Sequence, residues 1–84
     1  MHHIRWFAEA EDSLATLWLN GDSSFRRTLG ARVNEMERSL SADPFQESES
    51  REGEERILLK LPLAMLFDVD EATAAVWVSD VWRF

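Results

Sequence analysis

The amino-acid sequence predicts an α+β fold in which an N-terminal helical hairpin packs on a small antiparallel sheet, in the order β-α-α-β-β-β. Apolar residues in the first half of the chain recur at helical spacing, whereas the second half holds three apolar runs of strand length. Turn residues divide these segments, at Asn20-Gly21 and at Asp43-Pro44. The 84 residues are expected to form a single domain, residues 1–84.

The N-terminal segment predicts a short strand followed by a first helix. Ile4 and Trp6 alternate with polar neighbours, which favours a strand. From Ala8 the period becomes helical, acids crowd the first turns where they suit the helix dipole, and Asn20-Gly21 gives a stop signal. The apolar stripe expected to face the core consists of Phe7, Ala10, Leu14, Leu17 and Trp18.

A second helix is predicted between residues 22 and 43. Asp22-Ser23-Ser24 offers side-chain oxygens for the helix N-terminus. One apolar stripe then runs along the helix at spacings of three and four, through Phe25, Leu29, Val33, Met36 and Leu40. Asp43-Pro44 ends it, because the residue before a proline avoids the helical region. The short connection between the helices predicts an antiparallel hairpin.

The C-terminal third predicts an antiparallel meander. Its apolar runs are Ile57–Leu61, Leu63–Val69 and Ala74–Trp82. Alternation places Leu63, Met65, Phe67 and Val69 on one apolar face, and Asp70–Thr73 suits a hairpin loop. The face away from the helices, with Trp77, Ala64 or Leu66 partly on it, is expected to stay accessible. An accessible apolar face on so small a protein suggests a partner.

Composition and charge exclude several classes of function. The net charge is −7, and residues 47–55 carry five acids against one arginine, so the chain is a poor passive binder of phosphate backbones. This acidic stretch lacks the alternating ligand spacing of a calcium loop. The absence of cysteine excludes disulfides and thiolate metal sites. No metal or small-molecule cofactor is expected. With no secretory leader and no apolar run of about 20 residues, a cytoplasmic protein without a membrane role is expected.

Four features in order resemble the RelE/ParE family of type II toxin–antitoxin toxins. They are a short strand before an acid-rich helix, a second helix ending in Leu40-Ser41-Ala42-Asp43-Pro44, an approach to the sheet from Glu49-Ser50-Arg51 to Arg56, and the strand pair PLAMLFDVD and AAVWVSDVW. The resemblance implies a microbial-RNase-like fold. It also implies that some members cleave mRNA on the ribosome, that others poison DNA gyrase, and that most are neutralised by a small antitoxin.

The chain departs from the ribonuclease pattern that the resemblance implies. Ala64 stands where the middle strand usually carries an arginine, and the usual C-terminal tyrosine would lie beyond Phe84. The matching basic positions are Arg56, Lys60 and Arg83, which are the candidates for stabilising charge on a phosphate during cleavage. The acids that remain as candidates for the general base are Glu54, Glu55 and Asp80. The sequence therefore favours binding over catalysis.

Each candidate residue also has a structural interpretation. Arg56, Lys60 and Arg83 can be solvated strand charges, and truncating Arg56 or Arg83 to alanine is expected to cost under about 0.5 kcal/mol. Arg51 is expected either to pair with neighbouring carboxylates or to tie the acidic loop to the sheet. Trp77 and Trp82 are packing residues or an aromatic platform on which a nucleobase stacks. Arg27 and Arg38 form a solvated helix face or a docking surface for an acidic antitoxin segment.

Three hypotheses of function follow. The first is a toxin-like component of a toxin–antitoxin pair, which acts by protein binding and is neutralised by a cognate antitoxin. The second is a ribosome-dependent mRNA endoribonuclease with an atypical active site. The third is a decayed family member without toxicity. The ribosome with its mRNA and DNA gyrase are the targets that the resemblance suggests.

Overall fold

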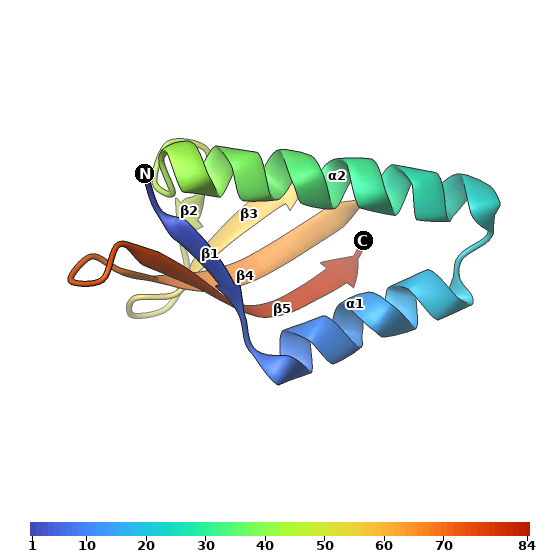
Figure 1. The fold of residues 1–84 in the computed structure, drawn as a ribbon, viewed down its shortest axis with the longest axis horizontal. Helices are drawn as coiled ribbons and strands as arrows, with labels where there is room; N and C mark the ends of the chain where they lie inside the picture. The colour runs from blue at the N-terminus through green and yellow to red at the C-terminus, as the bar shows by residue number, and fades with distance from the viewer.

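The computed structural model describes residues 1–84 as two helices and five strands (Figure 1). The elements are β1 (His3–Trp6), α1 (Ala8–Asn20), α2 (Ser23–Ala42), β2 (Glu49–Ser50), β3 (Arg56–Lys60), β4 (Leu63–Asp70) and β5 (Ala75–Arg83). The predicted elements are confirmed to within one residue or two at each end. The two-residue strand β2 was not predicted, since it lies inside the acidic loop. Neither helix has the combination of length and apolar composition that crossing a bilayer requires.

The five strands form one mixed sheet in the order β1-β5-β4-β3-β2. Strands β3, β4 and β5 are the predicted antiparallel meander. Strand β1, in contrast, pairs parallel with β5, from His3 opposite Ala75 to Trp6 opposite Val78. The prediction of a wholly antiparallel sheet is therefore corrected at this one strand. Periodicity shows which side chains share a face but gives no strand direction.

Helix α2 lies along one face of the sheet and closes the main core (Figure 1). The Asp22 carboxylate accepts a hydrogen bond from the Phe25 backbone N–H (2.8 Å), so the predicted N-cap is confirmed. The whole predicted stripe of α2 is buried. Its buried partners on the strands are Leu58, Leu63, Met65, Phe67, Val76 and Val78.

Helix α1 flanks the part of β5 that extends beyond β1 (Figure 1). Leu14 and Leu17 pack against the core, while the Ser13 hydroxyl donates to the Asp80 carboxylate at 3.0 Å. Ala10 is the one fully buried residue of this helix. Phe7 and Trp18 were predicted to face the core, but 43% and 47% of their surfaces remain exposed. The predicted stripe is wrong at these two ends because α1 covers a sheet edge, which is narrower than a sheet face.

A β-bulge in β5 sets which side chains reach the open face of the sheet. Leu66 pairs with Asp80 and Phe67 with Val78, which leaves Ser79 as the extra residue. Val78 and Val81 consequently both point into the core, where they are 0% and 2% exposed.

Candidate functional site

The strand cations Arg56, Lys60 and Arg83 lie on the helix side of the sheet and do not converge. Lys60 and Arg83 stand opposite Leu63 on its two neighbouring strands, so their backbones are roughly 10 Å apart. Arg56 precedes Lys60 by four residues on the same strand, roughly 13 Å along β3.

Arg56 ties the loop after α2 to strand β3. Its Nε donates to the Ser48 hydroxyl at 2.9 Å, and its Nη2 donates to the Ser48 carbonyl at 3.0 Å. The guanidinium also lies 5.1 Å from the centroid of the Phe45 ring. For Arg51 the sequence left two roles open, pairing with neighbouring carboxylates or tying the loop to the sheet. Its backbone N–H bonds to the Glu55 carbonyl at 2.8 Å within the loop, and its side-chain role stays a prediction.

The other two cations are engaged as well. Lys60 forms an ion pair with Glu47, and Glu47 also accepts a hydrogen bond from the Ser39 hydroxyl at 2.9 Å. The hydrogen bond from Lys60, and after it the one from Ser39, lower the pKa of Glu47 below its ordinary value of 4.5. The Arg83 guanidinium lies 4.1 Å from the centroid of the Phe25 ring on α2. Each of the three cations therefore contacts a different part of the fold.

The face of the sheet away from α2 carries acids and tryptophans. Register places Ala64 opposite Trp82, Leu66 opposite Asp80, and Asp68 opposite Trp77 on this face. A shallow cavity of about 470 Å³ opens on it, lined by Arg51, Glu52, Glu55, Leu66, Asp80 and Trp82. We call these six residues the open-face cavity. Ala64, which stands where the resemblance implies an arginine, is only 1% exposed.

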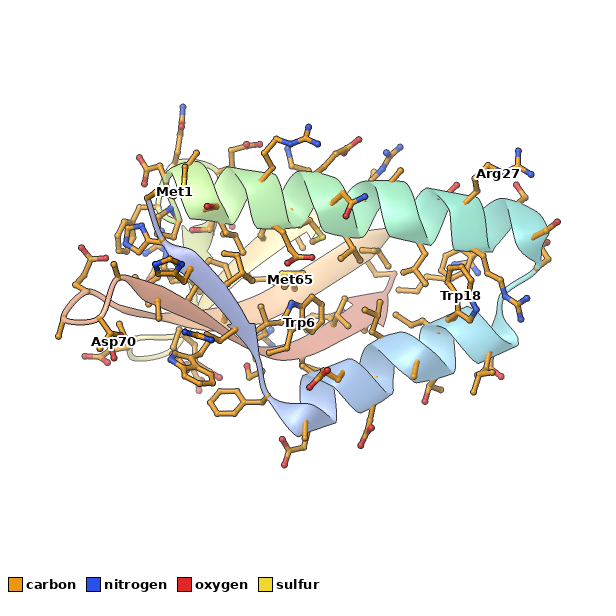
Figure 2. All side chains as sticks on the ribbon, viewed as in Figure 1. Met1, Trp6, Trp18, Arg27, Met65 and Asp70 are labelled. Carbon is orange, nitrogen blue, oxygen red and sulfur yellow. The ribbon has the colours of Figure 1, made fainter.

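A second concave surface lies between the two helices. This apolar groove has a volume of about 610 Å³ and is lined by Trp6, Glu11, Leu14, Ala15, Trp18, Leu19, Val33 and Glu37. Figure 2 shows Trp6 and Trp18 in the space between α1 and α2. We call these eight residues the interhelical groove. Sequence reasoning missed it because Trp18 was assigned to the core; the signal available was Leu19, an apolar residue next to the stripe.

Arg27 and Arg38 both lie on the surface of α2, away from its buried stripe. Figure 2 shows Arg27 at the outer side of the helix, away from the sheet. Trp77 packs against Phe7 with ring centroids 5.0 Å apart, and Trp82 is half-buried on the open face. These four predicted partner-binding residues thus divide between two distant surfaces. Their role in binding stays a prediction.

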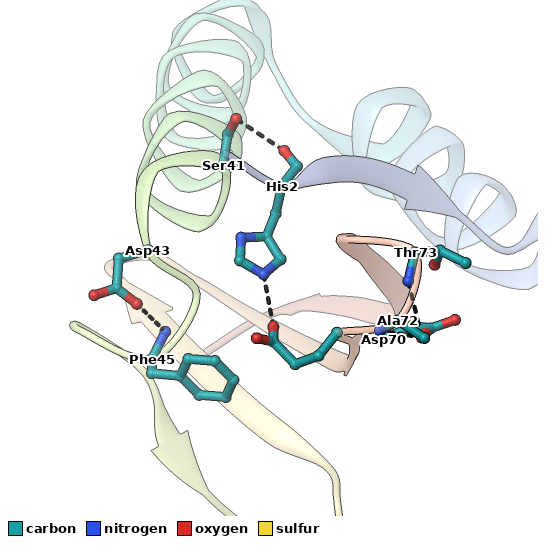
Figure 3. A network of polar contacts seen from close by, with 8 residues as sticks. His2, Ser41, Asp43, Phe45, Asp70, Ala72 and Thr73 are labelled. Carbon is teal, nitrogen blue, oxygen red and sulfur yellow. Dashed lines mark hydrogen bonds and ion pairs between the residues drawn. The ribbon is translucent and has the colours of Figure 1, made fainter.

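A polar network fixes the N-terminus to α2 and to the β4–β5 hairpin (Figure 3). The His2 ring Nε2 lies 2.7 Å from the Glu71 carboxylate, and the Ser41 hydroxyl donates to the His2 carbonyl at 2.9 Å. The His2 backbone N–H in turn donates to the Ser41 carbonyl at 2.8 Å. The network anchors strand β1 and gives His2 a structural role.

Comparison with known structures identifies the fold. The chain matches a chain of the RelBE2 toxin–antitoxin complex of Mycobacterium tuberculosis with a TM-score of 0.79 and 21% identity, over 99% of this chain and 98% of that one. A chain of the intact Escherichia coli RelBE toxin–antitoxin complex gives 0.66 and 14%, over 100% and 98%. The isolated E. coli RelE toxin gives 0.66 and 16%, over 99% and 84%.

The chain therefore has the fold of the RelE toxins, and the resemblance seen in the sequence is confirmed at the level of the fold. No protein-family model matches the chain, and a search of curated proteins finds no significant match.

Proposed function

We propose that this protein is the toxin component of a type II toxin–antitoxin pair, that it acts by binding a protein target, and that a cognate antitoxin neutralises it. The observation that carries the proposal is the RelE fold with its strand cations each engaged in a separate structural contact. Two of the structures with this fold are toxin–antitoxin complexes.

The arrangement of charged groups supports binding over RNA cleavage. Metal-free cleavage of RNA needs a base, an acid and cations that meet at one phosphate. Here Arg56, Lys60 and Arg83 are apart and occupied, and the chain has no tyrosine. The acids of the open-face cavity would repel a phosphate backbone.

The interhelical groove suits the antitoxin. Six of its eight lining residues are hydrophobic, and Trp18 and Leu19 are 47% and 73% exposed. An amphipathic helix of a partner binds such a groove through apolar side chains at helical spacing. Glu11 and Glu37 would then accept basic residues at the margins of that helix.

Expression of the chain alone and together with the neighbouring reading frame tests the proposal. We expect growth arrest with intact transcripts, relieved when the neighbouring protein is co-expressed. Cleaved transcripts would overturn the binding mechanism in favour of ribosome-dependent cleavage, and normal growth would favour a non-toxic relative. Pull-down of ribosomes or of DNA gyrase with the tagged chain separates the two targets that the resemblance suggests.

The groove is tested with the double variant Trp18→Ala, Leu19→Ser. Both side chains are about half or more exposed, so folding should survive while rescue by the antitoxin is lost. Asp12→Asn is the matched control, because Asp12 is exposed on the same helix outside the groove. If both variants are rescued equally, the antitoxin binds elsewhere.

A further inference from the structure

We propose that the open face of the sheet binds a basic peptide segment of a partner protein, through arginine or lysine side chains. This surface is separate from the interhelical groove, and the inference goes beyond the toxin function and does not depend on it. The inference starts from a sheet face that no helix covers and that carries both tryptophan and carboxylate side chains, because such a face indicates an interaction site.

The charge of the face selects a cationic ligand. The open-face cavity holds the carboxylates of Glu52, Glu55 and Asp80 against one cation, Arg51. Asp68 adds a carboxylate to the same face on β4, opposite Trp77. On the edge strand β1, Arg5 stands opposite Trp77 and adds one positive charge at that edge of the sheet. Excess carboxylate at the centre of the face attracts arginine or lysine and repels phosphate.

The apolar part of the face suits the stems of the same side chains. Trp82 and Leu66 are half-buried in the cavity, and Leu59 on the adjacent strand is 49% exposed. A guanidinium group stacks favourably on an indole ring, and the aliphatic part of arginine or lysine packs on leucine. A ligand with charged ends and apolar stems therefore matches both halves of the surface.

Asp80 is held in place to accept such a ligand. Its Oδ1 accepts from the Ser13 hydroxyl at 3.0 Å and from the Val81 backbone N–H at 2.9 Å. Asp80 belongs to strand β5, and these bonds fix the orientation of its carboxylate. Both bonds go to Oδ1, so they engage only one of its two oxygens. The other oxygen is available to a charged donor, and a fixed acceptor binds it with little loss of side-chain entropy.

Binding of a designed probe tests the inference. The probe is a short fluorescein-labelled peptide of alternating arginine and leucine. Its controls are the same peptide with glutamate in place of arginine and a single-stranded RNA of equal length. We expect fluorescence anisotropy to show binding of the arginine peptide alone, with affinity that falls as salt rises. Preferential binding of the RNA or of the glutamate peptide would overturn the inference.

The four tryptophans locate the binding face within the same experiment. Trp77 and Trp82 lie on the open face, while Trp6 and Trp18 line the interhelical groove. In a two-dimensional ¹⁵N–¹H NMR spectrum, the indole N–H signals of Trp77 and Trp82 should shift on addition of the arginine peptide. Shifts confined to Trp6 and Trp18 would place the peptide in the groove and overturn the inference.

Charge removal completes the test. Asp80→Asn and Glu55→Gln should each weaken binding of the arginine peptide about tenfold, because each removes one charge-assisted hydrogen bond. Glu35→Gln, which removes the same charge from α2, should leave the affinity unchanged. The Asp80→Asn side chain retains an oxygen for Ser13 and Val81, and Glu55 lies outside any strand or helix, so at least one variant keeps the fold. Equal affinities in all three variants would overturn the inference whatever the outcome of the growth assay.

Discussion

Truncation of Arg56 tests whether this cation is structural. The side chain donates two hydrogen bonds to Ser48, at 2.9 and 3.0 Å, and lies 5.1 Å from the Phe45 ring centroid. Hydrogen bonds from a charged donor contribute about 1.5–3 kcal/mol, and an exposed cation–π contact adds about 0.5 kcal/mol. Since Arg56 is half-buried, we expect Arg56→Ala to lower the free energy of unfolding by about 2 kcal/mol. This revises the sequence-based expectation of a change under about 0.5 kcal/mol.

Urea unfolding followed by tryptophan fluorescence measures this loss. Arg56→Lys is the matched control, because it keeps the charge but cannot form the two-pronged contact with Ser48. We expect the lysine variant to lose about half as much as the alanine variant, since a single charged donor can still reach the loop. If Arg56→Ala unfolds at the wild-type urea concentration, the loop tie contributes nothing. Arg56 would then again be a free surface cation and a candidate for binding phosphate.

Three further predictions concern stability. Phe67→Ala should cost about 3–5 kcal/mol in urea unfolding because Phe67 is 0% exposed, and a loss below about 1 kcal/mol would contradict its place in the core. Ala74→Gly should raise the free energy of unfolding by about 1 kcal/mol, since Ala74 has φ 52°, and a lower melting temperature would contradict this. The pKa of Glu47 is lowered in the fold, so its pairing with Lys60 stabilises the protein above pH 4.5 and is lost as the pH falls through the folded-state pKa. Glu47→Gln should therefore flatten the acid side of the stability profile, and an unchanged acid limb would refute the pairing.

The second helix and the meander were predictable because the burial of a single apolar face dominates the structure of each. The apolar stripe of α2, from Phe25 to Leu40, has a single way to be buried, and all five of its residues are buried. The predicted face of β4 likewise turns to the core, with Leu63, Met65 and Phe67 each 0% exposed. In both elements the local pattern and the tertiary packing favour the same arrangement.

The features that escaped prediction depend on contacts between distant segments. The direction of β1 is set by its pairing with β5, which lies at the opposite end of the chain. The interhelical groove arises because α1 packs on an edge of the sheet, which leaves Trp18 half exposed. Neither fact is encoded in the periodicity of a single segment.

The placement of the cations follows from the alternation of side chains along a strand. Leu58 is buried beneath α2, so Arg56 and Lys60, two residues away on either side, must share its face. Arg83 likewise shares the helix-side face of the sheet with Val81, two residues before it. Both side chains reach that face because the bulge at Ser79 shifts the alternation of β5 by one residue. A regular strand would turn Asp80 and Trp82 into the core and would direct Arg83 to the open face. The extra residue in β5 thus places Asp80 on the open face in place of Arg83, which adds to the excess of carboxylate that Glu52, Glu55 and Asp68 already provide there.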